Sequence, residues 1–300
     1  MKKIVIIIAI IVLIIIGYCI YKANTATNTS TLQEEVVVVE ATASPTITPT
    51  PEPEELTIYD IEEGYLTVKS NQKADKHEYN WDKLDNATPY YKYEDENYTS
   101  KLGVDVSEYQ GDIDWERLKE AGVEFAILRL GYRGYGQAGR IVLDEKFEEN
   151  YTGATENGIE VGVYFFSQAI NIDEVREEAD IVLERLGGKQ ITYPVAFDLE
   201  RIKHDDARTD NLTNEEISNM ALEFCKIIES NGYTPCVYGN SKTFTTKMAL
   251  EQFNSYNKWY ADYLEKPLYP YEFSIWQYTE KGRIDGIEGN TDLNICFVKK

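Results

Sequence analysis

Two acidic residues, Asp198 and Glu200, end the apolar run YPVAFDLE at residues 193–200, with a single leucine between them. Burying a carboxylate costs free energy, so we expect this run to be a strand that ends where it meets solvent. Carboxyl groups crowded into one site cannot all ionise, because each negative charge raises the pKa of its neighbours. One of them then keeps its proton near neutral pH and can act as a general acid.

The composition leaves carboxylates as the main candidates for chemistry. The 300 residues include 52 acidic and 30 basic ones, and the formal net charge of -22 would repel nucleic acid over most of the surface. Only two histidines are present, His77 and His204. Multi-histidine zinc sites are thereby excluded, and a Ser-His-Asp or Cys-His site would rest on one isolated histidine. We expect no cofactor and no metal.

Alternating strand-like and helix-like segments in the C-terminal two-thirds of the chain predict the frame that positions the acids. Apolar runs such as EFAILRLG and EVGVYFFSQ are followed by amphipathic stretches that begin near Asp114, Asp144 and Asp173, the rhythm of a parallel α/β fold. Helices are also expected over residues 213–230 and 241–253, and three strand-like runs follow without a helix between them. Eight strands and five helices predict a modified TIM-like barrel, with an open doubly wound sheet as the alternative.

A barrel would bring acids that are distant in sequence to one place. Alternate residues of a barrel strand face the interior, so Asp198 and Glu200 should point the same way at the C-terminal mouth. Asp105 lies near the end of the first strand, and Asp292 opens the last strand, which closes beside the first. We therefore expect several carboxylates at the mouth, where barrel enzymes build their active sites. The plain alternative is that Asp105 and Asp292 each cap a loop.

Three segments are expected before the barrel. Residues 1–22 begin with two lysines and continue as an almost uninterrupted apolar run, which predicts a transmembrane anchor with its N-terminus inside. Residues 23–55 are rich in Thr, Pro and Glu and predict an extended, flexible tether. Residues 56–100 form a lead-in rich in Tyr, Asp and Glu, with the hairpin-like stretch YDIEEGYLTVKSN, and residues 101–300 form the barrel domain.

Four segments together resemble glycoside hydrolase family 25, the Chalaropsis-type lysozymes of bacteria and phages. They are GVDVSEYQGDIDWERLKEAGVEFAILRLGYRG, GVYFFSQA, YPVAFDLE and WQYTEKGRIDGIEGNTDLN, in the order and spacing of the family, and the resemblance covers nearly all of residues 102–298. It implies a barrel of eight strands and five helices. It also implies hydrolysis of the β-1,4 bond between N-acetylmuramic acid and N-acetylglucosamine in peptidoglycan.

The resemblance implies a role for each acid. Glu200 would donate a proton to the leaving oxygen. Asp198 would orient and stabilise the substrate's own acetamido group as it attacks the anomeric carbon, a substrate-assisted retaining route. Asp105 and Asp292 match the supporting acids of the family. Cleavage of a glycosidic bond needs one protonated acid and one negative group beside an oxocarbenium-like transition state, and it needs no metal.

Sugar rings also need flat apolar platforms and planar hydrogen-bonding groups. The predicted strand ends supply six candidates for these contacts, each of which could instead be ordinary packing: Tyr132, Tyr164, Phe166, Tyr238, Trp276 and Gln277. A chitinase-like barrel is disfavoured, since it would carry a further aspartate at the position of Ala196. A catalytically silent wall-binding or scaffold protein on the same fold is the second alternative.

The expected partners follow from this architecture. They are the glycan strands of peptidoglycan and, through the N-terminal helix, the cell membrane. We expect a single-pass monomer with its C-terminal domain outside, in a Gram-positive-type envelope. Because the tether has limited reach, the protein would remodel the cell's own wall locally.

Overall fold

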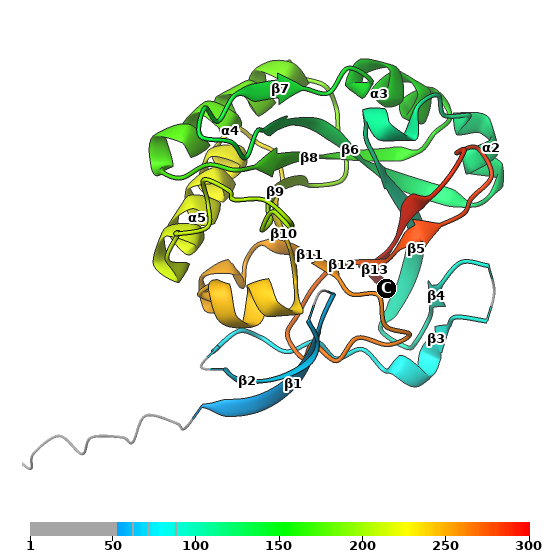
Figure 1. Cartoon of the computed structure of the whole chain (residues 1–300). Helices are drawn as coiled ribbons and strands as arrows, with labels where there is room; N and C mark the ends of the chain where they lie inside the picture. The colour runs from blue at the N-terminus through cyan, green and yellow to red at the C-terminus, as the bar shows by residue number, and fades with distance from the viewer. Residues whose placement is uncertain (1–52, 62, 71, 88) are drawn as a thin grey trace, which may run out of the picture. The chain divides into compact units, whose positions relative to one another are not determined.

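The computed structural model describes residues 53–61, 63–70, 72–87 and 89–300 (Figure 1). All of them belong to one unit of the chain, Glu52–Lys300. The anchor predicted for residues 1–22 and the tether as far as residue 52 lie outside the described residues. Within the described part, no helix is both long enough and apolar enough to cross a membrane.

The centre of the structure is a closed barrel. Neighbouring strands pair in the order β5-β13-β12-β11-β10-β9-β8-β6, and a further pairing between β5 and β6 closes the ring. Strand β13 is antiparallel to both of its neighbours, and the other pairings in the ring are parallel. This closure confirms the predicted barrel and excludes the open sheet. The strands are β5 (Tyr98–Val106), β6 (Val123–Arg133), β8 (Glu160–Ser167), β9 (Val195–Leu199), β10 (Pro235–Asn240), β11 (Asn257–Ala261), β12 (Ile275–Gly282) and β13 (Thr291–Lys299).

Four α-helices connect the parallel strands on the outside of the ring (Figure 1). Side chains cap three of them at the N-terminus: Asp114 accepts from the N–H of Arg117, Asn171 from that of Glu174, and Thr213 forms a capping box with Glu216. The helices are α2 (Trp115–Glu120), α3 (Phe147–Glu156), α4 (Ile172–Leu186) and α5 (Asn214–Ser230), and a short strand β7 (Ile141–Leu143) pairs with the end of β6.

Two predicted helix starts were wrong by a few residues. Helix α4 is capped by Asn171, so Asp173 lies within its first turn. Helix α3 begins at Phe147 without a side-chain cap. Asp144 is instead buried, and its carboxylate accepts hydrogen bonds from Arg129 Nε at 2.8 Å and from the backbone N–H of Glu108 at 3.0 Å.

The fifth predicted helix, over residues 241–253, is not an α-helix. The segment forms a π-helix, η3 (Thr243–Lys247), and then a 3-10 helix, η4 (Leu250–Phe253). Three threonines at 243, 245 and 246 disfavour a regular helix, because branching at Cβ restricts their side chains. The side chain of Gln72 also donates to the carbonyls of Phe244, Thr245 and Met248, which a regular helix would use itself.

Side chains alternate between two apolar clusters along each barrel strand. In β9, Val195 and Phe197 pack in the outer cluster that faces the helices, whereas Ala196 packs in the cluster inside the ring. The ring is filled by large side chains, and a Cβ atom added at Gly103 would lie 2.3 Å from the ring of Phe125. The acids Asp105 and Asp198 lie beyond this packing, toward the C-terminal ends of β5 and β9.

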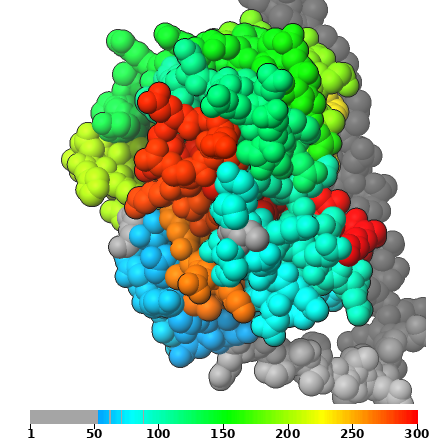
Figure 2. Space-filling view, turned by 90° about the vertical axis from the view of Figure 1, so that its right-hand side faces the viewer, coloured from blue at the N-terminus to red at the C-terminus, as the bar shows by residue number. Residues whose placement is uncertain are grey.

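The lead-in covers the side of the barrel that has no helices. It begins with β1 (Glu54–Asp60) and β2 (Gly64–Ser70), which pair as the hairpin expected from the sequence. The elements that follow are η1 (Trp81–Lys83), β3 (Leu84–Asp85) and β4 (Lys92–Tyr93). Tyr79 stacks on Phe297 of β13 at a ring-centroid distance of 4.0 Å, and Trp81 contacts Trp276 of β12 edge to face. Figure 2 shows the lead-in, blue at the hairpin and cyan after it, against the orange and red C-terminal segments.

Gln72 joins the lead-in to the segment that replaces the fifth helix. Besides the three carbonyls that it donates to, its Oε1 accepts from the backbone N–H of Leu250 at 2.8 Å. Removing this amide leaves several partly buried backbone groups without their partner. We expect Gln72→Ala to lower the free energy of unfolding by about 1–3 kcal/mol in chemical denaturation. Gln190→Ala is the matched control, because the Gln190 side chain is exposed, and an equal loss in both variants would contradict this role for Gln72.

Candidate active site

A cavity of about 660 Å³ opens at the mouth of the barrel, where the parallel strands end. It is lined by the four predicted acids and by five of the six predicted sugar-binding residues. These residues are Asp105, Asp198, Glu200, Asp292, Tyr132, Tyr164, Phe166, Tyr238 and Gln277. We call this cavity the main cleft. Within the described residues, no group of three His, Cys, Asp or Glu side chains is arranged to hold a metal ion.

Asp105 and Asp292 lie side by side because β13 pairs antiparallel with β5 and places them directly opposite each other. Asp105 is buried, and its Oδ2 accepts hydrogen bonds from Gln277 Nε2 at 2.9 Å and from Asn294 Nδ2 at 2.8 Å. Burial, the negative charge of Asp105 and a hydrogen bond to it raise the pKa of Asp292 to about 9. The arrangement therefore holds a proton on Asp292, which donates to the carboxylate of Asp105.

Asp198 is the most isolated acid of the cleft. It is 4 % exposed, near the end of β9, and its Oδ1 has no hydrogen-bond partner. Burial raises the pKa of Asp198 well above its usual range, and the charges of Glu200 and Asp105 raise it further. Glu200 follows the last residue of the strand and is exposed at the cleft. The cleft thus combines a buried carboxyl group, Asp198, with a solvent-exposed one, Glu200.

Neighbouring side chains fix the orientation of the amides that hold Asp105. The hydroxyls of Tyr238 and Tyr263 donate to Gln277 Oε1 at 3.1 and 2.9 Å, so the Gln277 amide nitrogen faces Asp105. Trp259 Nε1 donates to Asn294 Oδ1 at 2.8 Å, which turns the other amide in the same way. Burial raises the pKa of Asp105, and both amides can only donate to it, which offsets part of that rise.

Trp276 is the predicted site residue that the structure places elsewhere. It is fully buried on the outer side of β12, packs on Trp81, and donates from Nε1 to the carbonyl of Asp262 at 2.7 Å. Adjacent residues of a strand point to opposite faces, so Trp276 and Gln277 could not both face the cleft. The prediction of Trp276 as a sugar platform was therefore wrong, and the alternation itself could have shown this.

Two exposed aromatic residues at the rim were missed. Tyr109 is 76 % exposed and Tyr135 is 41 % exposed, and both line the main cleft. The guanidinium of Arg129 lies 4.7 Å from the ring centroid of Tyr109 and 5.3 Å from that of Tyr132. Arg129 is held in turn by ion pairs with Glu108 and Asp144. These rings provide flat surfaces where a sugar can stack.

Other missed residues support the acids. Asn294 lies two residues after Asp292 in β13, so the rule that paired Asp198 with Glu200 would also have placed Asn294 inside the barrel. Tyr263 follows the end of β11, and no sequence signal marks it.

The proton shared by Asp105 and Asp292 should make stability depend on pH. The folded-state pKa of Asp292 is about 9, far above that of an unfolded aspartate. The proton on Asp292 therefore contributes fully to the free energy of unfolding below about pH 4, and this contribution is lost as the pH rises toward 9. Asp292→Asn retains a donor to Asp105 but cannot titrate. Relative to the unmodified chain, we expect this variant to gain at least about 1 kcal/mol of stability between pH 5 and pH 8 in urea denaturation.

Asp180→Asn, a change on the exposed face of α4, is the control for this series. The same pH dependence in Asp292→Asn and in the unmodified chain would show that the pair does not retain its proton.

Comparison with known proteins agrees with this geometry. The chain is 27% identical to the uncharacterized protein YegX of Escherichia coli over 204 residues, which cover 64% of this chain and 68% of YegX. It is 26% identical to the autolytic lysozyme of Clostridium acetobutylicum over 197 residues, 64% of this chain and only about half, 54%, of that protein. The crystal structure of a bacterial lysozyme from Streptomyces coelicolor matches with a TM-score of 0.54 and 25% identity, over 65% of this chain and 90% of the lysozyme.

A family model identifies the same part of the chain. Residues 104–287 match the model of glycosyl hydrolases family 25. The match includes the strands β6, β8, β9, β10, β11 and β12 of the barrel and three of the acids of the main cleft, Asp105, Asp198 and Glu200. The chain therefore belongs to glycosyl hydrolases family 25.

Proposed function

We propose that this protein is a peptidoglycan hydrolase, a lysozyme that cleaves the β-1,4 bond between N-acetylmuramic acid and N-acetylglucosamine. The observation that carries the proposal is the pairing of a buried carboxyl, Asp198, with an exposed one, Glu200, in one cleft. Hydrolysis of a glycoside needs two acids in different environments. The relatives named as lysozymes point to the same substrate.

In the proposed reaction, Glu200 gives its proton to the glycosidic oxygen as the bond to the anomeric carbon breaks. The carbonyl oxygen of the substrate's acetamido group forms the new bond to that carbon, giving an oxazolinium ion. Glu200, now a carboxylate, takes a proton from the water that opens this ring, and the original anomeric configuration is restored.

Asp198 suits the second role in this route. Its unpaired Oδ1 can accept a hydrogen bond from the N–H of the acetamido group. The same burial that raises the pKa of Asp198 in the free protein makes it respond strongly to positive charge on the substrate. The positive charge that develops on the oxazolinium ion lowers the pKa of Asp198, so Asp198 releases its proton to solvent and stabilises the ion as a carboxylate. Asp105 and Asp292 line the cleft beside it.

The sugar-binding surface is assigned to the aromatic and amide side chains of the main cleft. Tyr132, Tyr164, Phe166 and Tyr238 line it, and Tyr109 extends it at the rim. Gln277 accepts from the hydroxyls of Tyr238 and Tyr263 at Oε1 and donates one N–H of Nε2 to Asp105. Gln277 therefore positions Asp105, and its second N–H can donate to a sugar hydroxyl in the cleft.

We also propose that the protein acts from the outer face of the cell membrane. The apolar run within residues 1–22 supports a retained anchor, and the Thr-, Pro- and Glu-rich stretch after it supports a tether. The predicted end of the tether at residue 55 was wrong by two residues, because Glu54 and Glu55 are already part of strand β1. A single-pass monomer in a Gram-positive-type envelope would then act on wall material within reach of its tether.

The activity is tested by mass spectrometry of the sugars that the full chain releases from purified peptidoglycan. Fragments with N-acetylmuramic acid at the new reducing end are expected. N-acetylglucosamine at that end would indicate a glucosaminidase, and binding without release would favour a wall-binding protein.

Glu200→Gln tests the proton donor. The amide cannot supply a proton, so we expect turnover to fall by about 10²- to 10⁴-fold while binding to peptidoglycan is retained. Glu156→Gln makes the same change at an exposed position of α3 and should leave the rate unaffected. Solubilisation of walls by Glu200→Gln at the rate of the unmodified chain would contradict the assignment.

The location is tested by fractionation of a Gram-positive host that expresses the full chain. We expect the protein in the membrane pellet, released by detergent but not by alkaline carbonate, because the apolar run buries in the bilayer. Deletion of residues 2–22 should move it to the soluble fraction. Recovery in the medium of a chain that begins after Lys22 would contradict retained anchoring.

A further inference from the structure

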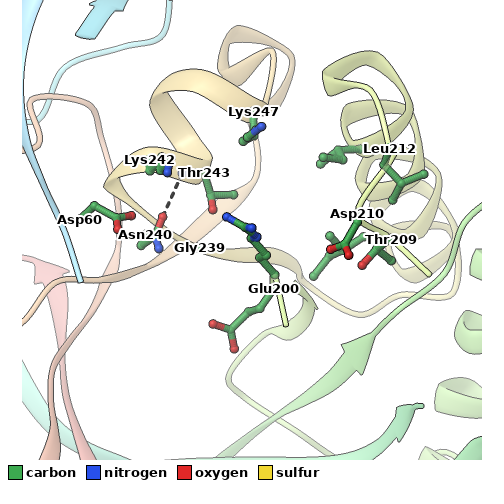
Figure 3. A pocket seen from close by; sticks show the side chains of 13 residues that line it. Asp60, Glu200, Thr209, Asp210, Leu212, Gly239, Asn240, Lys242, Thr243 and Lys247 are labelled. Carbon is green, nitrogen blue, oxygen red and sulfur yellow. Dashed lines mark hydrogen bonds between the residues drawn. The ribbon is translucent and has the colours of Figure 1, made fainter. Parts of the chain in front are cut away.

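A second cavity, of about 360 Å³, adjoins the main cleft. We call it the side cavity. Glu200, Arg201 and Asn240 line both of them, so the two hollows meet at the proposed proton donor. Figure 3 shows that the carboxylate of Glu200 points away from Thr243 and Lys247, which lie on the far wall of the side cavity. The side cavity therefore lies behind the reacting carboxylate, on the side away from the main cleft.

Apolar side chains form one part of the wall of the side cavity, and basic side chains form another. Leu199, Leu212 and Ile217 provide the apolar part. Lys242 and Lys247, at the two ends of the segment that forms η3, provide basic groups on the wall opposite the residue 209–212 loop (Figure 3). This combination suits a ligand with short aliphatic side chains and negative groups.

Two cations of the side cavity are not used by the protein itself. Lys242 forms an ion pair with Glu63 of the β1–β2 hairpin, so its charge is already matched. Arg201 and Lys247 are exposed, and among the described residues neither of them forms an ion pair. In a chain with a net charge of -22, two uncommitted cations at one cavity mark a place where a carboxylate would be attracted.

Three acids also line the side cavity, and backbone N–H groups orient two of them. Asp210 uses Oδ2 to accept from the backbone N–H of Ala207 at 2.9 Å, and Asp60 uses Oδ1 to accept from that of Glu63 at 2.9 Å. Glu200 is turned toward the other hollow (Figure 3).

We infer that the side cavity binds the peptide stem of peptidoglycan through the carboxylates of the stem, with Arg201 and Lys247 as the charge partners. The inference rests on the proposed function. The muramic acid whose bond Glu200 cleaves carries its peptide on the same sugar ring, so the stem starts within about one ring width of Glu200. The side cavity opens at that point and offers apolar surface for alanine side chains beside cations for the carboxylates.

The β1–β2 hairpin adds a wall to this subsite from outside the part of the chain that matches the family model. Asp60 lines the side cavity and Ile61 lines the main cleft, and both lie outside the family match at residues 104–287. The ion pair between Glu63 and Lys242 fixes the hairpin on η3. The hairpin therefore forms a wall where the two cavities meet.

The test compares two substrates for the full chain. One is uncrosslinked glycan strands that carry their stems and have been freed of phosphate polymers, and the other is the same strands after an amidase has removed the stems. We expect Lys247→Glu to lower kcat/KM on stem-bearing strands by roughly three- to tenfold more than on stem-free strands. Lys226→Glu, at an exposed position of α5, is the control with the same charge change and should not alter the ratio.

Each outcome decides something different. A stem preference that weakens with added salt and disappears when the stem carboxylates are amidated would support the inference. An unchanged ratio in Lys247→Glu would overturn it, as would a preference found only on walls that keep their phosphate polymers. Failure of the unmodified chain to cleave either substrate would instead overturn the proposed function.

Discussion

The antiparallel pairing of β13 with β5 is the constraint on which the rest of the site depends. It closes the barrel, and it also places Asp292 directly opposite Asp105. Two adjacent buried carboxyls share a proton more readily than they hold two charges, because burial and mutual repulsion both disfavour the second charge. The closure of the fold and the protonation of the site are therefore set by the same contact. A shift of one residue in this register would turn Asp292 toward the outside of the barrel.

Amide groups hold Asp105, and hydroxyl and indole groups orient those amides. Gln277 and Asn294 donate to Asp105, and their own oxygens are occupied by Tyr238, Tyr263 and Trp259. Such neutral donors keep the floor of the cleft rigid without adding a positive charge that would compete with a cationic transition state. Asp198 has no donor at its Oδ1, so its last partner must come with the substrate. A fixed set of acids beside one unpaired oxygen is the arrangement from which the proposed mechanism follows.

The lead-in explains how the barrel tolerates three closing strands without helices. Aromatic residues of this segment, Tyr79 and Trp81, pack on Phe297 and Trp276, where helices would otherwise exclude water. The same segment begins with the β1–β2 hairpin, whose residues Asp60 and Ile61 reach the two cavities. The lead-in, which joins the predicted tether to the barrel, thus both covers the barrel strands that lack helices and forms part of the wall of the substrate site.

Much of the architecture is determined by the sequence alone, through short-range periodicity. The alternation of apolar runs and amphipathic stretches predicts the barrel, and the i, i+2 spacing brings Asp198 and Glu200 to one mouth. The same alternation of strand residues places Trp276 on the outside of the barrel and Gln277 on the inside, and it places Asn294 on the same face as Asp292. Tertiary structure alone decided that residues 241–253 form a π-helix and a 3-10 helix, because Gln72 takes carbonyls that an α-helix needs. It also decided which acid keeps a proton, since the pKa of Asp292 depends on burial and on a partner from the other end of the barrel domain. Periodicity is local and is written in the order of the residues, whereas burial and charge coupling arise only when distant segments meet.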